Sequence, residues 1–172
     1  IIIEDEKIPV QRLAALMKLQ QITSGYVIVP RPGEEPEMHY VSENNPRLAA
    51  LMELVEDIDD DVGVIIWARF RAEIEAITKA LKTAGKTFVE YHGGVKAADR
   101  EFAIEEFQSG RAQYFVGNAQ SGGIGLTLIR AEQMIYYSND FNRETRAQSE
   151  DRAHRIGQKK NVVYTDLAAI DT

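Results

Sequence analysis

The chain of 172 residues carries 20 basic and 27 acidic side chains, for a net charge of −7, and 44% of its residues are hydrophobic. This length suits one domain of ordinary size, and this composition excludes disordered, fibrous and low-complexity proteins. Because cysteine is absent, disulfide scaffolds, thiolate metal sites and cysteine nucleophiles are also excluded. Apolar runs such as 64–68 are far too short for a membrane span, so we expect a soluble, intracellular protein, cytoplasmic if its source is prokaryotic or viral, with no membrane partner.

Charge is spread unevenly along the chain. Residues 1–61 hold 13 acidic and 5 basic side chains, whereas residues 62–172 hold 14 acidic and 15 basic ones. Lys and Arg supply most of the affinity of proteins for nucleic acids, so any DNA contact must use a local patch of this acidic chain. The first residue is Ile and no basic segment leads into a long apolar stretch, so we expect a piece of a longer chain rather than a targeting peptide.

The first 44 residues predict a helix followed by a strand and a hairpin. Apolar residues at helical spacing favour a helix over 8–22 that ends near Gly25, and the apolar run 26–29 favours a strand. The proline-rich stretch 30–37 precedes a second short strand at 38–41, which indicates a hairpin or an edge excursion. We treat 1–44 as a leading segment of a single 172-residue lobe whose core is 45–172.

From Asn45 onward, helices and strands alternate. Asn45 is expected to cap a helix that begins with Pro46, and the apolar run 62–67 is typical of a strand buried on both faces of a parallel sheet. The remaining pattern predicts helices at 73–84, 97–109 and 143–155, strands at 87–91, 113–116, 134–137 and 162–164, and a glycine-rich turn at 121–125. This alternation predicts an α/β fold with a mainly parallel central sheet and helices on both faces, whose ligands gather at the carboxyl ends of the strands.

One near-match to a nucleotide-binding motif is misleading. Residues 80–87 differ from the phosphate-loop pattern GxxxxGK[ST] only at the first position. A phosphate loop leaves a strand and opens a helix, whereas here a helix precedes and a strand follows, so Gly85 is predicted to end the helix instead. The three histidines are far apart in sequence and offer no metal-binding spacing, so we expect no metal site.

The segment 143–155 is polar almost throughout. On a helix of that length, Gln148, Arg152 and Arg155 project from one face. One explanation is a solvated helix tied by pairs such as Arg146–Glu150. The other is a functional face, because a helix that is polar all round needs an explanation beyond core packing.

The spacing within this segment favours the functional explanation. The string from Gln148 to Gln158 resembles motif VI of superfamily 2 helicases, and in particular the Gln-x-x-Asp-Arg-x-His-Arg-Ile-Gly-Gln signature of SWI/SNF-type DNA translocases. In family order, 64–70 resembles motif IV, 91–94 resembles a glycine-containing turn, and 117–128 looks like motif V. The family usually has Trp-Asn-Pro after the aspartate that precedes motif VI, where this chain has Phe141-Asn142-Arg143.

The resemblance implies a three-layer RecA-like lobe, the second of two lobes that bind ATP between them. Arg152 and Arg155 would act as arginine fingers, Gln148 would help to position the γ-phosphate or the attacking water, and Gly123 and Gly125 would join the arginines in contacting ATP. The missing first lobe would supply the phosphate loop and hold Mg²⁺. The chain alone is therefore expected to bind neither ATP nor Mg²⁺ tightly and to be inactive.

Double-stranded DNA is the second partner that the resemblance implies. The residues expected to touch its backbone follow predicted strand ends or lie in the motif V turn; they are Arg69, His92, Gly93, Asn118, Ala119 and Ser121. Two alternatives stay open: a lobe of a strand-separating RNA or DNA helicase, and a non-catalytic α/β module that binds a phosphate group or a protein partner.

Overall fold

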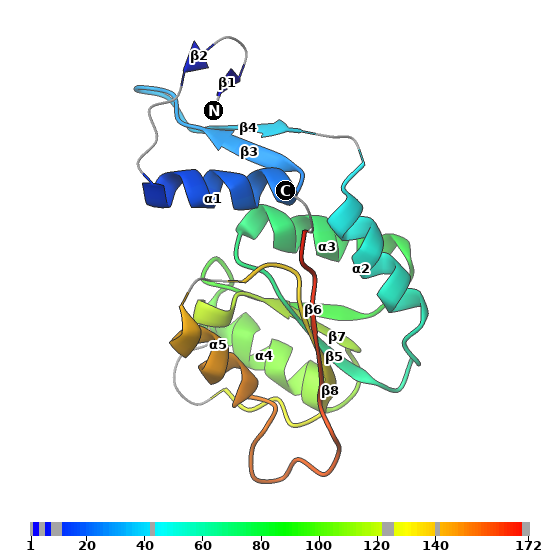
Figure 1. The fold of residues 1–172 in the computed structure, drawn as a ribbon. Helices are drawn as coiled ribbons and strands as arrows, with labels where there is room; N and C mark the ends of the chain where they lie inside the picture. Colours follow the sequence, from blue (N-terminus) through cyan, green and yellow to red (C-terminus); the bar gives the residue numbers. More distant parts are fainter. Residues whose placement is uncertain are drawn as a thin grey trace. The chain divides into compact units, whose positions relative to one another are not determined.

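The computed structural model describes residues 2–3, 6–7, 12–41, 44–121, 126–139 and 142–169. The chain divides into two compact units, residues 1–49 and residues 50–172 (Figure 1). Among the described residues, no helix is long and apolar enough to cross a membrane.

The first unit contains the predicted helix and hairpin. Helix α1 (Arg12–Thr23) is followed by strand β3 (Tyr26–Val29), which pairs antiparallel with β4 (Glu37–Tyr40) as a separate two-stranded sheet. A second small antiparallel pair joins β1 (Ile2–Ile3) to β2 (Glu6–Lys7). Gly25 makes the turn between α1 and β3 with φ of +86°, a conformation that glycine adopts without steric cost.

Helix α2 (Pro46–Glu56) begins where the sequence predicts. The side-chain oxygen of Asn45 accepts hydrogen bonds from the backbone N–H groups of Arg47 and Leu48, both at 3.1 Å, which satisfies two donors that the first turn leaves free. The apolar face of the helix is buried at Leu51 and Val55.

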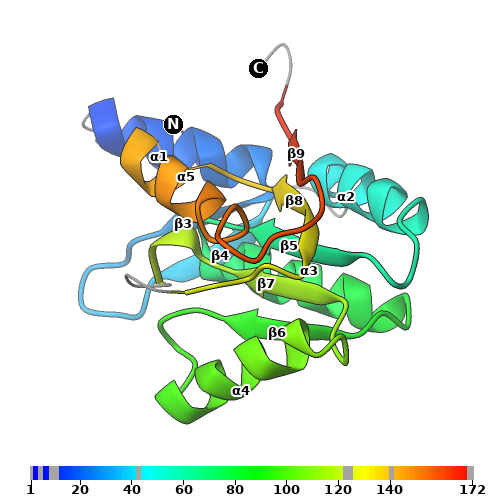
Figure 2. The ribbon, with the colours of Figure 1, turned by 90° about the horizontal axis from the view of Figure 1, so that it is seen from below.

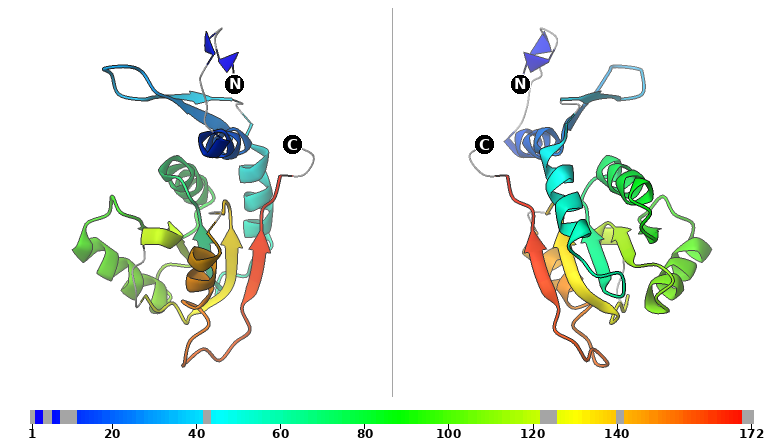
Figure 3. Two further views of the ribbon diagram at one scale, coloured as in Figure 1. Left: turned by 60° about the vertical axis from the view of Figure 1, so that its left-hand side comes forward. Right: turned by 90° about the vertical axis from the view of Figure 1, so that its right-hand side faces the viewer.

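The second unit is built on a five-stranded sheet, in the order β6-β7-β5-β8-β9, whose paired neighbours all run parallel. Every residue of the central strand is buried, as the apolar run predicts. The labels in Figure 2 show this order from β9 to β6, and both views in Figure 3 place β9 beside β8. The strands are β5 (Gly63–Trp67), β6 (Phe88–Tyr91), β7 (Tyr114–Gly117), β8 (Ala131–Tyr136) and β9 (Val163–Asp166).

Helices cover both faces of this sheet. Helix α3 (Arg71–Thr83) lies on one face, whereas α4 (Ala97–Gln108) and α5 (Arg143–Glu150) lie on the other (Figure 2). A short 3₁₀ turn, η1 (Ala119–Ser121), follows β7. The predicted three-layer α/β architecture of a RecA-like lobe is therefore confirmed.

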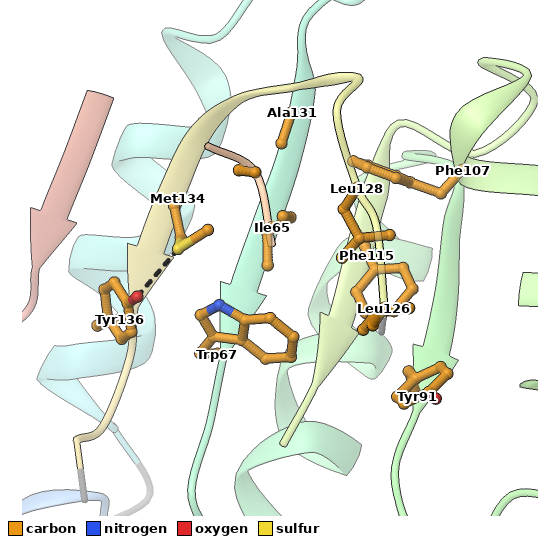
Figure 4. Packing of buried hydrophobic residues seen from close by; sticks show 11 residues of the cluster. Ile65, Trp67, Tyr91, Phe107, Phe115, Leu126, Leu128, Ala131, Met134 and Tyr136 are labelled. Carbon is orange, nitrogen blue, oxygen red and sulfur yellow. Dashed lines mark hydrogen bonds between the residues drawn. The ribbon is translucent and has the colours of Figure 1, made fainter. Parts of the chain in front are cut away.

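A layer of aromatic and aliphatic side chains fills the space between the sheet and α4. Alternate residues of each strand contribute to it, because successive side chains of a strand point to opposite faces. The rings of Trp67 and Phe115 lie edge to face with centroids 6.0 Å apart, and Phe107 from α4 packs on Phe115 at 5.5 Å. Figure 4 shows this layer, which continues through Ile65, Met134 and Tyr136.

The structure settles the near-match to a phosphate loop. Gly85 follows the end of α3 with φ of +71°, and the backbone N–H of Lys86 donates to the carbonyl of Leu81 at 3.0 Å. This is the left-handed helix termination that the sequence predicts, and strand β6 follows it.

The polar helix is shorter than predicted. Helix α5 ends at Glu150, so the expectation that it continues to Arg155 is wrong. The N–H groups of Arg152 and Ala153 donate to carbonyls three residues back, which tightens the backbone into a turn. The carbonyl of Arg152 meanwhile accepts the N–H of Leu128 at 2.9 Å, so a segment far away in the sequence occupies the acceptor that a longer helix would use.

Candidate functional site

Three loops meet at the carboxyl edge of the sheet. They follow β5, β7 and β8, which are hydrogen-bonded neighbours and run in the same direction. Together with α5 they form an open pocket with about 360 Å³ of empty space, including its mouth. Its described lining includes two arginines but no Asp or Glu; the lining residues are Trp67, Ala68, Arg69, Asn118, Ala119, Gln120, Tyr136, Ser138, Asn139, Thr145, Arg146 and Ser149.

A buried carboxylate fixes the loop after β5. Glu73 is only 1% exposed, and its carboxylate accepts the N–H of Phe70 at 3.0 Å and the hydroxyl of Ser138 at 2.5 Å. The same hydroxyl accepts the N–H of Arg69 at 2.8 Å, so the loops after β5 and β8 are tied together. Sequence reasoning missed Glu73, although an acidic residue in the first turn of a helix is a recognisable capping signal.

Asn118 connects the loop after β5 to the one after β7. Its side-chain N–H donates to the carbonyl of Arg69 at 2.6 Å, and its side-chain oxygen accepts the N–H of Gln120 at 2.8 Å. The second bond shapes η1, which carries Ala119 and Ser121. Four of the residues predicted to contact DNA therefore lie together at this edge of the sheet.

His92 and Gly93 follow β6, as predicted, but the histidine faces inward. The imidazole is buried, its Nδ1 accepts the N–H of Gly94 at 3.1 Å, and its Nε2 lies 3.4 Å from a carboxylate oxygen of Glu90. Gly93 is exposed, and a Cβ built on it meets no atom within 4 Å. What this turn offers to a partner is therefore its exposed backbone rather than the histidine ring.

Arg152 lies inside the protein. Its side chain is 5% exposed, one terminal nitrogen donates to the carbonyl of Ala119 at 2.7 Å, and its guanidinium lies over the ring of Trp67, 5.2 Å from the centroid. The other terminal nitrogen is buried without a partner among the described residues. This burial lowers the pKa of Arg152 from its usual value, since removing a cation from water disfavours its charged form.

Arg155 and Gln148 are exposed, and their side chains contact different partners from those of Arg152. The guanidinium of Arg155 donates to the hydroxyl of Thr127 at 3.0 Å and to the carbonyl of Asp151 at 3.3 Å. The amide of Gln148 donates to Glu144 at 3.2 Å, within α5. The predicted common helix face of Gln148, Arg152 and Arg155 is thus wrong, because the helix ends before either arginine. The predicted ATP contacts Gly123 and Gly125 lie outside the described residues.

Arg146 is the most heavily bonded side chain of α5. It donates to Glu150 at 2.5 Å and to both carboxylate oxygens of Asp166 at 2.6 and 3.1 Å, and it lies 3.4 Å from the ring centroid of Tyr136. Burial alone would lower the pKa of Arg146, but its hydrogen bonds to the two carboxylates raise it above the usual value. The i,i+4 pair with Glu150 was predicted, whereas nothing local in the sequence points to Asp166.

The described residues offer no carboxylate cluster suited to a metal ion. In the part of the chain that the structure describes, no group of three His, Asp or Glu side chains could hold one.

The chain is similar to a known family of domains and to known proteins. The model of the helicase conserved C-terminal domain matches residues 46–157. The Arabidopsis thaliana protein CHROMATIN REMODELING 24 is 39% identical over 123 residues, which are 70% of this chain. The ATP-dependent helicase FUN30 of Saccharomyces cerevisiae is 30% identical over 129 residues, or 73% of this chain.

A solved structure supports the same grouping. The C-terminal part of the Fun30 ATPase domain aligns with a TM-score of 0.68 and 29% identity, covering 73% of this chain and 42% of that chain. The present chain spans only 11% of the length of each of the two relatives above.

Proposed function

This chain belongs to the helicase conserved C-terminal domain family, and we propose that it is the second motor lobe of an ATP-dependent, SNF2-type translocase that acts on double-stranded DNA. Its relatives include an ATP-dependent helicase and a protein named for chromatin remodelling. The observation that carries the proposal is the direct linkage of motifs IV, V and VI at one edge of the sheet, through Arg69, Asn118, Ala119 and Arg152.

The nucleotide side of the proposal rests on Arg155. It is exposed in the turn after α5, and its guanidinium donates to the hydroxyl of Thr127 and to the backbone carbonyl of Asp151. A planar guanidinium at the lobe surface can bind phosphate oxygens in a forked geometry that lysine cannot offer. Gln148, exposed on the last turns of α5, would help to position the γ-phosphate or the attacking water.

This lobe would form only one side of the site that binds ATP and Mg²⁺. Residues 80–87 form a helix end rather than a phosphate loop, and the described residues offer no cluster of metal ligands. A first lobe of the same chain would therefore hold the triphosphate and Mg²⁺, which supply the phosphoryl group and neutralise its charge. The isolated lobe would not hydrolyse ATP.

The DNA side of the proposal rests on the carboxyl edge of the sheet. The pocket there is lined by Arg69 and by several amides and hydroxyls that can donate to phosphate oxygens, whereas its second arginine, Arg146, is paired with Glu150 and Asp166. Such a local surface suits backbone phosphates, which fix position without reading sequence. We propose contacts from Arg69, the exposed backbone at Gly93, and the turn that includes Asn118, Ala119 and Ser121.

A single substitution in the full-length parent tests the proposal. Arg155→Ala should lower DNA-stimulated ATP turnover by roughly 10³-fold, because an arginine finger stabilises the charge that develops during phosphoryl transfer. The matched control is Arg143→Ala, which removes an exposed arginine from the first turn of α5 and should leave turnover within about twofold of the parent. Near-parental turnover of Arg155→Ala would contradict the proposed role and favour the non-catalytic module.

A further inference from the structure

Side chains from two other loops bind both backbone polar groups of Arg69. Its N–H donates to the hydroxyl of Ser138 at 2.8 Å, and its carbonyl accepts the side-chain N–H of Asn118 at 2.6 Å. Ser138 follows β8 and Asn118 follows β7, the two strands that flank β5 in the sheet. The loop after β5 is therefore held from both sides.

The bond between Arg69 and Ser138 depends on a carboxylate. A serine hydroxyl has one hydrogen, which Ser138 donates to Glu73 at 2.5 Å, so the oxygen of Ser138 meets the N–H of Arg69 as an acceptor. The same carboxylate oxygen of Glu73 accepts the N–H of Phe70, the next residue of the loop. Glu73 is 1% exposed and Ser138 is buried, so these hydrogen bonds are shielded from water.

Glu73 can act on a ligand in the pocket only through other residues. It belongs to the first turn of α3 and is not among the described residues that line the pocket, whereas Arg69 and Ser138 both line it. Its carboxylate fixes the hydroxyl of Ser138, and that hydroxyl fixes the backbone of Arg69. Any effect of Glu73 on a bound phosphate therefore passes through Ser138 and the loop after β5.

We propose that Glu73 and Ser138 are positioning residues for the DNA contact of Arg69. This inference rests on the function proposed above, in which Arg69 binds a backbone phosphate. Fixing the peptide groups before and after Arg69 fixes the direction in which its side chain leaves the backbone. Less conformational freedom is then lost when the guanidinium binds a phosphate, which favours binding.

Binding of a short DNA duplex to the full-length parent without nucleotide, measured by fluorescence anisotropy, tests this role. Arg69→Ala should weaken binding by roughly tenfold, the range of one charge-assisted hydrogen bond. Ser138→Ala should weaken it by roughly threefold to fivefold, because Arg69 is present but no longer held. Glu73→Gln should keep the affinity within about twofold, since an amide oxygen can accept both bonds that now go to one carboxylate oxygen.

A double variant separates positioning from stability. In the Arg69→Ala background, Ser138→Ala should weaken duplex binding by less than about twofold, because the side chain that Ser138 positions is gone. The backbone N–H of residue 69 is still present, so Ser138→Ala should lower the thermal stability of the parent equally in both backgrounds. Equal weakening of DNA binding in both backgrounds overturns the positioning role. Binding that Glu73→Gln strengthens more than about twofold also overturns it, because the charge of Glu73 would then act on DNA directly.

Thr78 provides the matched control. It is buried on the same helix as Glu73, its hydroxyl donates to the carbonyl of Glu75 at 3.3 Å, and it does not line the pocket. Thr78→Ala should lower stability and leave DNA affinity unchanged, and a loss of affinity equal to that of Ser138→Ala contradicts the positioning role. If Ser138→Ala fails to fold, Ser138→Cys repeats the double-variant test with a thiol, which is a weaker donor and acceptor of similar shape.

Failure of this inference and failure of the proposed function look different. If Arg69→Ala weakens DNA binding and Ser138→Ala does not, the positioning role is wrong and the proposed DNA contact stands. If Arg69→Ala leaves DNA affinity unchanged, the DNA side of the proposed function fails and the positioning role fails with it. The turnover of Arg155→Ala then still tests the nucleotide side.

Discussion

Helix α5 and the turn that follows it are both polar in sequence, yet the alanine of one is exposed and the alanine of the other is buried. Along α5, Ala147 and Gln148 are exposed, and the helix is tied down by Arg146 at its side. In the turn, Arg152 and Ala153 are buried, and Ala153 belongs to the core layer. A polar stretch of sequence can therefore include residues that are buried in the core, as at Arg152, whose carbonyl accepts a hydrogen bond from the distant backbone N–H of Leu128.

The two alanines make the sharpest test of this difference. Ala153→Leu should destabilise the fold by about 2–3 kcal/mol, because extra methylenes do not fit a filled core. Ala147→Leu, at an exposed position of α5, should change stability by less than about 0.5 kcal/mol. Urea unfolding of both variants measures the difference. Equal costs would mean that the turn is as open to solvent as the helix.

Arg146 tests what attaches α5 to the sheet. Arg146→Ala should cost about 1–2 kcal/mol at pH 7, because it removes a partly buried double ion pair and a cation resting on Tyr136. The hydrogen bonds from Arg146 lower the pKa of Asp166, so this contribution is present above the unfolded value of about 4 and disappears as the pH falls through the folded value. The cost of the substitution should therefore shrink below about pH 4 in unfolding curves recorded from pH 7 to pH 3. A cost independent of pH would assign the effect to the contact with Tyr136 alone.

The smallest expected effect is at the start of α5. The side-chain oxygen of Asn142 accepts the N–H of Glu144 at 2.9 Å, so Asn142→Ala should cost about 1 kcal/mol through loss of the cap. Asn142→Ser or Asn142→Asp should restore most of it, since both residues cap helices. Thermal unfolding of the three variants decides whether the cap or the asparagine itself matters.

Local patterns predicted most of the fold. The apolar run of β5, the cap at Asn45 and the helix end at Gly85 each depend on residues within a few positions of one another, and each was confirmed. The carbonyl of Arg152, in the turn after α5, accepts the N–H of Leu128, which lies more than twenty residues earlier and meets it only in the folded chain. Helical spacing could not reveal that contact.

In the candidate site, too, some features follow from local sequence and others depend on distant contacts. The order of strands along the chain predicted that Arg69 and Asn118 follow strand ends, and parallel pairing of β5 with β7 brings them together. The inward position of His92 and the burial of Arg152 depend on which neighbours take their hydrogen bonds. A histidine or an arginine at a given position in the sequence is compatible with either a buried or an exposed side chain.

The strand order also has a consequence for how the chain acquires its fold. The central strand is the first of the five in sequence, yet its partners lie far along the chain: Val64 pairs with Tyr114, and Trp67 with Tyr136. During synthesis, β5 emerges as a strand with two unpaired edges and must wait for β7 and β8 before either edge is covered. Such distant pairings slow folding and leave apolar strands open to aggregation. We therefore expect refolding of this lobe to be limited by the docking of β7 and β8 onto β5.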